Sequence, residues 1–347
     1  MTSLGTTGIE ISRLILGCGN FGGIGSSPAW FGRGETREEA FVLMDAAWEA
    51  GITTFDTADA YGGGRSETYI GDWLRTKGPD VTDHIVLSTK TYNPMDTGED
   101  HGLAPARIKR QLESSLQRLG VERVSMYLTH EWDEEVPVAE TLGAMGELVA
   151  EGKVGAVGVS NVDGAQLAEA LAAGGARPGW VQNGYSLLER GDEREVLPLC
   201  ADHGLGFTPF SPLAGGWLTG RYRAGVEAKA PFSAARRRLA NRFDLSLPEN
   251  QRKLAAAEQL AELADKAGMT LVELAIAFVL RHPAVTSAII GPRTMEHLES
   301  QLPAADIELS DDVLDRIDEI VAPGVTVNPA DNGWVSPALQ PAARRRP

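Results

Sequence analysis

Four side chains suited to acid–base chemistry stand at, or a few residues past, the ends of short apolar runs: Asp56, Tyr61, Lys90 and His130. These runs cover residues 52–55, 85–89 and 124–129, and a stretch with helical periodicity follows each of them. Successive βα units of this kind form a parallel sheet. When such a sheet closes into a barrel, the carboxyl ends of its strands converge on one mouth. The sequence therefore predicts that the four side chains share one site.

The four residue types together indicate a proton-donating site. The hydroxyl of Tyr61 has a reference pKa of about 10, so it needs a nearby positive charge to stabilise its phenolate. Lys90 can supply that charge, and the carboxylate of Asp56 keeps Lys90 protonated, so we expect Lys90 to acidify Tyr61. His130 is suited to holding a carbonyl oxygen or sharing the tyrosine proton. A carbonyl that gains a proton on oxygen needs a hydride on carbon, which implies a nicotinamide.

The same residue types also allow other interpretations. Taken singly, an Asp, Lys or His at a strand end is commonly a cap, a surface charge or a satisfied polar group. Lys90 could form a Schiff base, as lysines do in lyase and aldolase barrels. A metal site built from His130, Asp133, Glu134 and Glu135 is a further alternative, but a solvated acidic helix start is favoured there. No metal is predicted.

The elements that would position these residues are those of a barrel. Candidate strands begin near Leu14, Thr53, Ile85, Val124, Val154, Trp180, Gly206 and Ser287. Helical segments lie between them at about 37–50, 66–76, 105–119, 138–151, 164–173, 193–203, 250–281 in two pieces, and 294–302. Eight strands alternating with helices predict an α/β protein, a (β/α)8 TIM barrel, with residues 1–347 forming a single domain.

Other segments extend this minimal barrel. Residues 4–11 predict an N-terminal β-hairpin that turns at Thr7 and Gly8 and plugs the barrel floor. The long stretch from Ser211 to about Pro248, and the tail after Pro323, are expected to fold over the mouth at the carboxyl ends of the strands. A doubly wound sheet is disfavoured, because the glycines at 17–22 have the wrong spacing for a dinucleotide fingerprint and a long loop follows them.

Composition excludes several classes of partner. The 347 residues carry a formal net charge of −16, which argues against a surface that holds a phosphate backbone. The basic cluster inside the chain, residues 236–238, is short and is interpreted as a solvated loop, so we expect no nucleic acid. Apolar runs are too short to cross a bilayer, and no targeting segment is visible, so a cytoplasmic protein is expected. Cys18 and Cys200 lack metal-ligand spacing and are interpreted as buried thiols. The sequence does not specify an oligomeric state.

Several segments, taken in order, resemble the aldo-keto reductases: 51–62, 88–90, 128–133, 158–161, 182–186, 209–213 and 290–294. The sequences of these segments are most similar to those of the bacterial branch that includes aryl-alcohol dehydrogenase-like reductases and relatives of potassium-channel β subunits. This resemblance implies an oxidoreductase that uses NADPH to reduce an aldehyde or ketone. It also implies that Tyr61 is the general acid, that Lys90 and Asp56 tune it, and that His130 orients the substrate.

The resemblance also implies a set of cofactor contacts. At the nicotinamide and pyrophosphate these are Gly19, Asn20, Phe21, Ser160, Asn161, Gln182, Phe210, Ser211, Pro212 and Leu213. At the adenosine end they are Gly291, Arg293, Thr294, His297 and Gln301. Many relatives carry basic residues at the positions of Gly291 and His297. Arg293 remains a planar donor suited to a 2′-phosphate, so NADPH is favoured and NADH remains possible.

Aromatic residues in loops are candidates for the substrate walls: Trp30, Phe31, Trp132, Phe232 and Trp334. Aromatic lining is common in pockets for small carbonyl compounds, although the same residues could pack loops against the barrel. The alternative function on the same barrel is a slow-turnover, nucleotide-binding subunit that senses redox state. The sequence leaves the physiological substrate and the direction of reaction open.

Overall fold

The computed structural model of the chain describes residues 1–98, 100–223 and 239–331. Its centre is a sheet of eight parallel strands: β3 (Leu14–Gly17), β4 (Thr54–Asp56), β5 (Val86–Thr91), β6 (Val124–Thr129), β7 (Val154–Ser160), β8 (Trp180–Gln182), β9 (Gly206–Phe207) and β10 (Ala288–Ile290). Their order in the sheet is β10-β3-β4-β5-β6-β7-β8-β9. Two backbone hydrogen bonds join its edges, from Thr286 N to Phe207 O (2.8 Å) and from Ile289 N to Pro209 O (2.9 Å). The sheet therefore curls into the predicted barrel.

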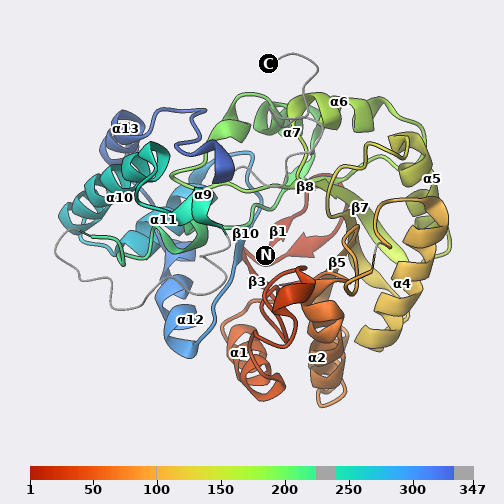
Figure 1. Cartoon of the computed structure of the whole chain (residues 1–347). Helices are drawn as coiled ribbons and strands as arrows, with labels where there is room; N and C mark the ends of the chain where they lie inside the picture. Colours follow the sequence, from red (N-terminus) through yellow and green to blue (C-terminus); the bar gives the residue numbers. More distant parts are fainter. Residues whose placement is uncertain (99, 224–238, 332–347) are drawn as a thin grey trace.

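Helices surround the sheet, as Figure 1 shows. They are α1 (Arg37–Glu49), α2 (Arg65–Leu74), α3 (Pro79–Thr82), α4 (Pro105–Leu119), α5 (Val138–Ala150), α6 (Gly164–Ala172), α7 (Val196–His203), α9 (Ala240–Phe243), α10 (Pro248–Lys266), α11 (Leu271–Arg281), α12 (Met295–Gln301) and α13 (Asp311–Ile320). Short 3-10 turns include η1 (Pro28–Trp30), η2 (Tyr61–Gly63), η4 (Ala214–Gly216) and η6 (Pro329–Asp331). Each predicted helix is present within a few residues of its expected bounds. The sequence prediction omitted α3, α9 and α13.

Side-chain caps fix the starts of several helices. Thr36 precedes α1, and its hydroxyl accepts from the backbone N–H of Glu39, whose carboxylate accepts from Thr36 N. Thr270 and Glu273 make the same reciprocal pair at the start of α11. These pairs satisfy backbone donors that have no partner within the helix. The start of α1 agrees with the predicted helix at about residues 37–50, whereas the sequence analysis predicted no separate start for α11.

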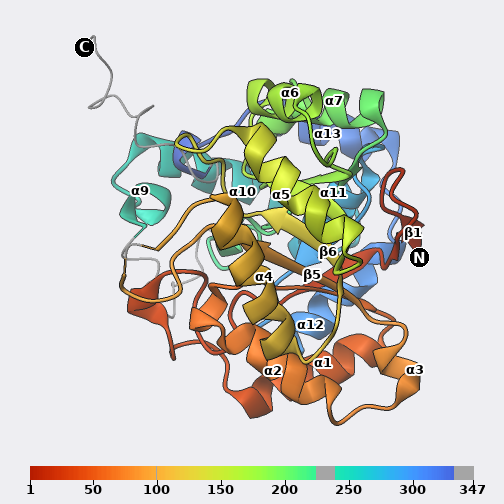
Figure 2. The same cartoon turned by 90° about the vertical axis from the view of Figure 1, so that its right-hand side faces the viewer.

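Successive side chains along each strand point alternately into the barrel and toward the helices, so the protein has an inner and an outer apolar core. Ile15 lies inside the barrel, whereas Leu14 and Leu16 pack against the surrounding helices. On β6, Met126 and Leu128 point inward and Tyr127 points outward. Such alternation follows from the two-residue period of a strand. Figure 2 shows α4 and α5 side by side over the outer face of the sheet.

The predicted N-terminal hairpin is present and lies at the barrel floor. Strands β1 (Thr2–Ser3) and β2 (Glu10–Ile11) pair antiparallel. Leu4 and Ile11 are fully buried in the inner core together with Trp180. The hairpin therefore closes the interior at the amino ends of the strands. The opposite end is left for the site.

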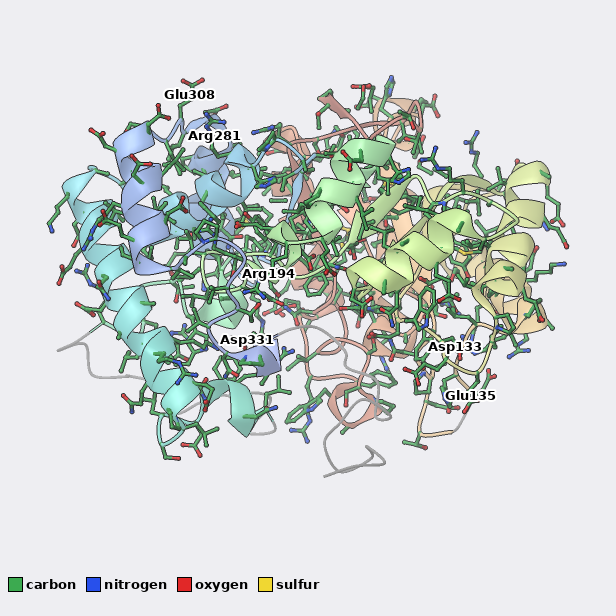
Figure 3. All side chains as sticks on the ribbon, turned by 90° about the horizontal axis from the view of Figure 1, so that it is seen from above. Asp133, Glu135, Arg194, Arg281, Glu308 and Asp331 are labelled. Carbon is green, nitrogen blue, oxygen red and sulfur yellow. The ribbon has the colours of Figure 1, made fainter. Side chains whose placement is uncertain are left out.

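The two ends of the barrel can be told apart in Figure 3. Asp133 and Glu135, in the loop after β6, lie at one edge, and Arg281, which ends α11 before β10, lies at the opposite edge. Asp331 in η6 lies toward the edge that carries Asp133. The loops after the strands therefore gather on one side of the molecule.

Part of the expected long connection after β9 is anchored by aromatic packing. The ring of Trp217, which is fully buried, stacks on Tyr222 with centroids 4.2 Å apart and lies parallel to Phe243 at 6.0 Å. Lys253 Nζ lies 4.6 Å from the Trp217 ring centre. This packing fixes both described ends of the connection onto α10. Its remaining residues, 224–238, and the tail from 332 lie outside the described part of the chain.

The structure also describes the two cysteines and the lengths of the apolar helices. Cys18 and Cys200 are both free and buried, as predicted, and burial raises the pKa of each thiol. No helix in the described part of the chain is long and apolar enough to cross a membrane.

We predict that Leu4→Ala lowers the stability of the protein by about 2–4 kcal/mol, because it removes a fully buried side chain from the inner core and leaves a cavity. Urea denaturation followed by tryptophan fluorescence measures the loss. The matched control is Val42→Ala, at a valine that is 54% exposed on α1. A midpoint for Leu4→Ala that equals that of the control would contradict the hairpin's role as the barrel floor.

Candidate active site

Three neighbouring strands and one loop bring the four predicted reactive side chains together. Asp56 is the last residue of β4, Lys90 lies near the end of β5, and His130 follows β6 directly. Tyr61 begins η2, in the loop after β4, and three consecutive glycines with positive φ follow it. Lys90 lies inside its strand rather than beyond it. The convergence expected of a parallel barrel is therefore present at this site.

Lys90 is the centre of the cluster. Its Nζ lies 2.5 Å from Asp56 Oδ2, 2.8 Å from the carbonyl oxygen of Thr57 and 3.3 Å from the hydroxyl of Tyr61. The side chains of Lys90 and Asp56 are only 1% and 5% exposed. Three acceptors around one ammonium use all three of its N–H donors. The arrangement holds a full positive charge beside the phenol.

The Asp56 carboxylate is also fully engaged. Its Oδ1 accepts from Ser88 Oγ at 2.9 Å and from Gln182 Nε2 at 3.1 Å, while Oδ2 accepts from Lys90. A buried ion pair is tolerated only when such hydrogen bonds replace the water that each charge has lost. Gln182, on β8, thus links the far side of the barrel to the ion pair.

Opposing effects set the pKa values of Lys90 and Tyr61. Burial acts to lower the pKa of Lys90, but Asp56 and Tyr61 overcome it and the net shift is upward. Burial raises the pKa of Tyr61, while Lys90 opposes that rise without cancelling it. Lys90 therefore lowers the pKa of Tyr61, as expected, but loss of water from the phenolate outweighs one ammonium and the net pKa lies above the usual value. Tyr61 keeps its proton at neutral pH.

His130 lies beside the phenol as a neutral ring. The Tyr61 and His130 rings meet edge to face, with centroids 5.5 Å apart. Burial, and then the charge of Lys90, lower the pKa of His130 well below its usual value. Its Nδ1 is buried without a hydrogen-bond partner among the described residues. An unpaired N–H is costly to bury, so we infer that Nδ1 is the unprotonated nitrogen and that Nε2 carries the hydrogen.

The residues expected to hold a carboxamide lie next to this cluster. Ser160 ends β7 and donates to Gln182 O at 2.6 Å, and Asn161 Nδ2 donates to the His130 carbonyl at 2.9 Å. Gln182 uses its amide nitrogen for Asp56. Within the described residues, the side-chain oxygens of Asn161 and Gln182 accept no hydrogen bond. They are thus available acceptors, and the residues fit a nicotinamide carboxamide.

Unusual backbone geometry marks the same region. The described non-glycine residues with positive φ are Asn161 (55°), Ser211 (59°) and Ala214 (49°). Two of them are expected cofactor contacts, and the third lies immediately after the 211–213 segment. Left-handed conformations at residues with a side chain are uncommon, and they cluster at ligand sites. The strain supports a binding role for the ends of β7 and of the segment after β9.

The other expected contacts near the nicotinamide lie around the mouth. Phe210 is partly buried and packs on the inner core, Pro212 is buried, and Leu213 is partly buried. Gly19 lies against Tyr61, because a Cβ there would be 3.6 Å from the phenol ring. Phe21 is buried and Asn20 is partly exposed. The turn after β3 therefore borders the tyrosine directly.

The expected adenosine-end residues lie along α12 and in the loop that precedes it. Thr294 caps this helix by accepting from His297 N at 3.2 Å. Gly291 is exposed, and Gln301 is buried at the end of the helix. Arg293 is partly exposed, and its Nε donates to Glu35 Oε1 at 2.6 Å. The acidic partner, Glu35, was not among the predicted site residues.

The aromatic candidates for the substrate walls are only partly described. Trp30 is in η1 and lies within cation–π distance of Arg33. Phe31 packs over Gly63 in the tyrosine loop, and Trp132 packs against the outer core. Phe232 and Trp334 lie outside the described residues. Among the described candidates, Phe31 is therefore in contact with the loop that carries Tyr61.

Two buried acids near the site were missed by sequence reasoning. Asp59 is fully buried and accepts from Thr91 Oγ1 at 2.7 Å, and burial raises its pKa to about 7. Glu131 is 9% exposed, and burial raises its pKa to about 8. Its Oε2 has no hydrogen-bond partner among the described residues. Their positions beside Asp56 and His130 were the available signal, but acids in loops usually face solvent.

A separate hollow lies at the other end of the barrel. It has a volume of about 520 Å³ and is lined in part by Thr2, Gly5, Leu197, Cys200 and His282. These residues belong to the N-terminal hairpin, α7 and the end of α11. The hollow is therefore remote from the four reactive side chains, and we do not assign the chemistry to it.

Comparisons with known proteins agree with this geometry. The sequence model of the Aldo/keto reductase family matches residues 13–322. The uncharacterized oxidoreductase YrpG of Bacillus subtilis (strain 168) is 38% identical over 92% of this chain and 95% of its own. The NADH-specific methylglyoxal reductase of Escherichia coli (strain K12) is 32% identical over 89% of this chain and 94% of its own. A probable voltage-gated potassium channel subunit beta of Arabidopsis thaliana is 32% identical over 92% and 95%, respectively.

We predict that His130 stays neutral well below pH 6.5, because protonation would place a second buried charge next to Lys90. Imidazole carbon and nitrogen shifts, followed by NMR from pH 8 to pH 5, measure this directly. The chain has six histidines, so His130→Gln identifies the resonance by its loss. Titration of that resonance near the usual histidine pKa would contradict the electrostatics described above.

Proposed function

The chain belongs to the aldo/keto reductase family, whose members are NAD(P)H-dependent oxidoreductases, and from this premise we propose that it reduces an aldehyde or ketone to an alcohol with NADPH as the favoured cofactor. The observation that carries the proposal is the position of Lys90. Its Nζ contacts both Asp56 and the hydroxyl of Tyr61 in a buried site.

Each member of the cluster has one task in this proposal. Tyr61 donates its proton to the oxygen of the substrate carbonyl. Lys90 stabilises the phenolate as it forms, and Asp56 keeps Lys90 charged. The N–H of neutral His130 donates a hydrogen bond to the same carbonyl oxygen and orients it. When bound, the nicotinamide supplies the hydride that reduces the carbonyl carbon.

The raised pKa of Tyr61 is compatible with this role. A proton donor has to hold its proton until transfer, and burial ensures that the phenol does so at neutral pH. During transfer, negative charge develops on the phenolic oxygen, 3.3 Å from the Lys90 ammonium. A fixed charge aimed at a developing charge lowers the barrier without reorganising solvent. Lys90 therefore acts mainly as the proton leaves.

The cofactor would be held by residues that project from the ends of β7, β8, β9 and β10. Asn161 and Gln182 offer amide oxygens to a carboxamide, and Phe210 offers an aromatic face. Arg293 offers a half-exposed guanidinium to a 2′-phosphate. The preference for NADPH rests on Arg293.

The alternatives considered from the sequence are less well supported. A Schiff base at Lys90 needs a free amine, but Asp56 and Tyr61 raise the pKa of this lysine and keep it an ammonium. A slow-turnover nucleotide-binding subunit is not favoured, because the family supports carbonyl reduction in general. Loss of nicotinamide absorbance with a panel of simple aldehydes and ketones would distinguish catalysis from binding alone.

We predict that Tyr61→Phe lowers turnover at least about 100-fold and leaves nucleotide binding within twofold, because it removes the transferable proton and keeps the ring. The nicotinamide absorbance gives turnover, and quenching of tryptophan fluorescence gives the nucleotide dissociation constant. Tyr69→Phe, in α2, is the control for loss of a tyrosine hydroxyl near the barrel. Unchanged turnover in Tyr61→Phe would remove the proposed acid.

We also predict that Arg293→Ala weakens NADPH binding more than NADH binding, because only NADPH carries the phosphate that needs the guanidinium. A loss of roughly tenfold in the affinity for NADPH corresponds to one charge-assisted contact at a half-exposed site. Isothermal titration calorimetry with both nucleotides measures the difference. Equal weakening of the two would mean that Arg293 does not bind the phosphate.

A further inference from the structure

The ion pair between Glu35 and Arg293 joins two segments that are far apart in sequence. Arg293 Nε donates to Glu35 Oε1 at 2.6 Å, and the two side chains are 45% and 4% exposed. Arg293 belongs to the loop between β10 and α12. Glu35 precedes α1, and its backbone is tied to the turn after β3, because Glu35 N donates to Asn20 O and Gly22 N donates to Glu35 O. Both segments are expected to contact the cofactor.

The Glu35 carboxylate has little else to balance its charge. Its Oε2 is buried without a hydrogen-bond partner among the described residues, so Arg293 is its one ion-pair partner there. The guanidinium uses only its Nε for this contact. Within the described part of the chain its two terminal nitrogens make no hydrogen bond, so its outer edge remains open. The pair is thus nearly neutral overall, with an open donor edge.

A carboxylate and an arginine have opposite preferences at the 2′ position of the adenosine ribose. Arginine favours the 2′-phosphate of NADPH, because its planar donors match phosphate oxygens. A carboxylate disfavours that phosphate and tolerates the 2′-hydroxyl of NADH. In this chain the two groups are in direct contact. The Glu35 carboxylate therefore opposes the preference for NADPH that Arg293 provides.

We propose that Glu35 is a specificity-determining residue: its carboxylate offsets the charge of Arg293 and narrows the preference for NADPH over NADH. The proposal rests on the proposed function, in which Arg293 serves the 2′-phosphate. Glu35 does not need to touch the nucleotide for this effect. It changes the affinity for NADPH, which carries the 2′-phosphate, relative to the affinity for NADH, which lacks it.

Glu35 could instead orient the guanidinium and thereby favour NADPH, so the two effects have to be weighed. Holding the guanidinium in place reduces the conformational entropy that the Arg293 side chain loses when it binds the phosphate. A neutral hydrogen-bond acceptor at position 35 would have the same effect. The charge effect involves the carboxylate of Glu35, which is 4% exposed and therefore poorly screened by solvent, and a phosphate group that is nearly dianionic. The charge effect is the larger, and it sets the direction of the prediction.

The test is equilibrium binding of NADPH and NADH to Glu35→Gln, which keeps the shape and the acceptor but removes the charge. We expect the ratio of the two dissociation constants to move toward NADPH by roughly tenfold, mainly through tighter binding of NADPH. Calorimetry or quenching of tryptophan fluorescence gives both constants without catalysis. Glu38→Gln, at an exposed acid in the first turn of α1, is the matched control and should leave the ratio within twofold.

A second variant covers the case in which Glu35→Gln does not fold, which a thermal melt would reveal. Arg293→Gln changes a half-exposed side chain and leaves the Glu35 carboxylate without its partner. Loss of Arg293 raises the pKa of the buried Glu35 carboxyl further, so binding is measured at a pH high enough to ionise it. If Glu35 opposes the phosphate, this variant should then bind NADH more tightly than NADPH. If Glu35 has no influence, the two nucleotides should bind about equally well.

The outcomes separate the two proposals. If the parent protein binds both nucleotides and Glu35→Gln leaves their ratio unchanged, the inference about Glu35 is wrong and the proposed function stands. A ratio that moves toward NADH would show that Glu35 orients Arg293 rather than offsetting it, and would also overturn the inference. If the parent protein binds neither nucleotide, the proposed function fails and the inference fails with it.

Discussion

The buried ion pair between Lys90 and Asp56 is the constraint on which the rest of the site depends. Taking two charges out of water costs several kcal/mol per ion, and only close geometry with further hydrogen bonds offsets that cost. The barrel meets this requirement from several elements at once: Ser88 on β5, Gln182 on β8 and the backbone of Thr57. A charge held at such cost is poorly explained by stability alone, and its position beside Tyr61 gives it a chemical purpose.

The same low-dielectric setting determines how the neighbouring groups behave. It keeps the Tyr61 proton in place and His130 neutral, so the resting site presents a donor on each of two rings beside one fixed cation. In our proposal, burial also lets the Glu35 carboxylate influence a ligand that it does not touch. Buried carboxylates pair with cations at two places in this barrel: Asp56 with Lys90, and Glu35 with Arg293.

Much of this arrangement could be predicted from the sequence, because strand ends and helix starts carry local signals such as the Thr36 and Thr270 caps. Helix α13 was missed although Ser310 and two acids precede apolar residues at helical spacing, so its signal was present. The burial of Glu35 and Glu131 was not visible, because it depends on contacts between distant segments. The rise in the Tyr61 pKa that burial causes was not visible for the same reason, because desolvation depends on tertiary structure.

The most direct test of the account is the ionisation of Tyr61 with and without the ion pair. Titration by NMR of protein labelled at the tyrosine phenolic carbon, with Tyr61→Phe to assign the resonance, measures this in the parent protein and in the double variant Lys90→Met/Asp56→Asn. The account predicts that Tyr61 ionises at a higher pH in the double variant, because Lys90 is the stronger of the two opposed influences on the phenolate. An unchanged or lower pKa of Tyr61 in that variant would contradict the claim that Lys90 stabilises the phenolate.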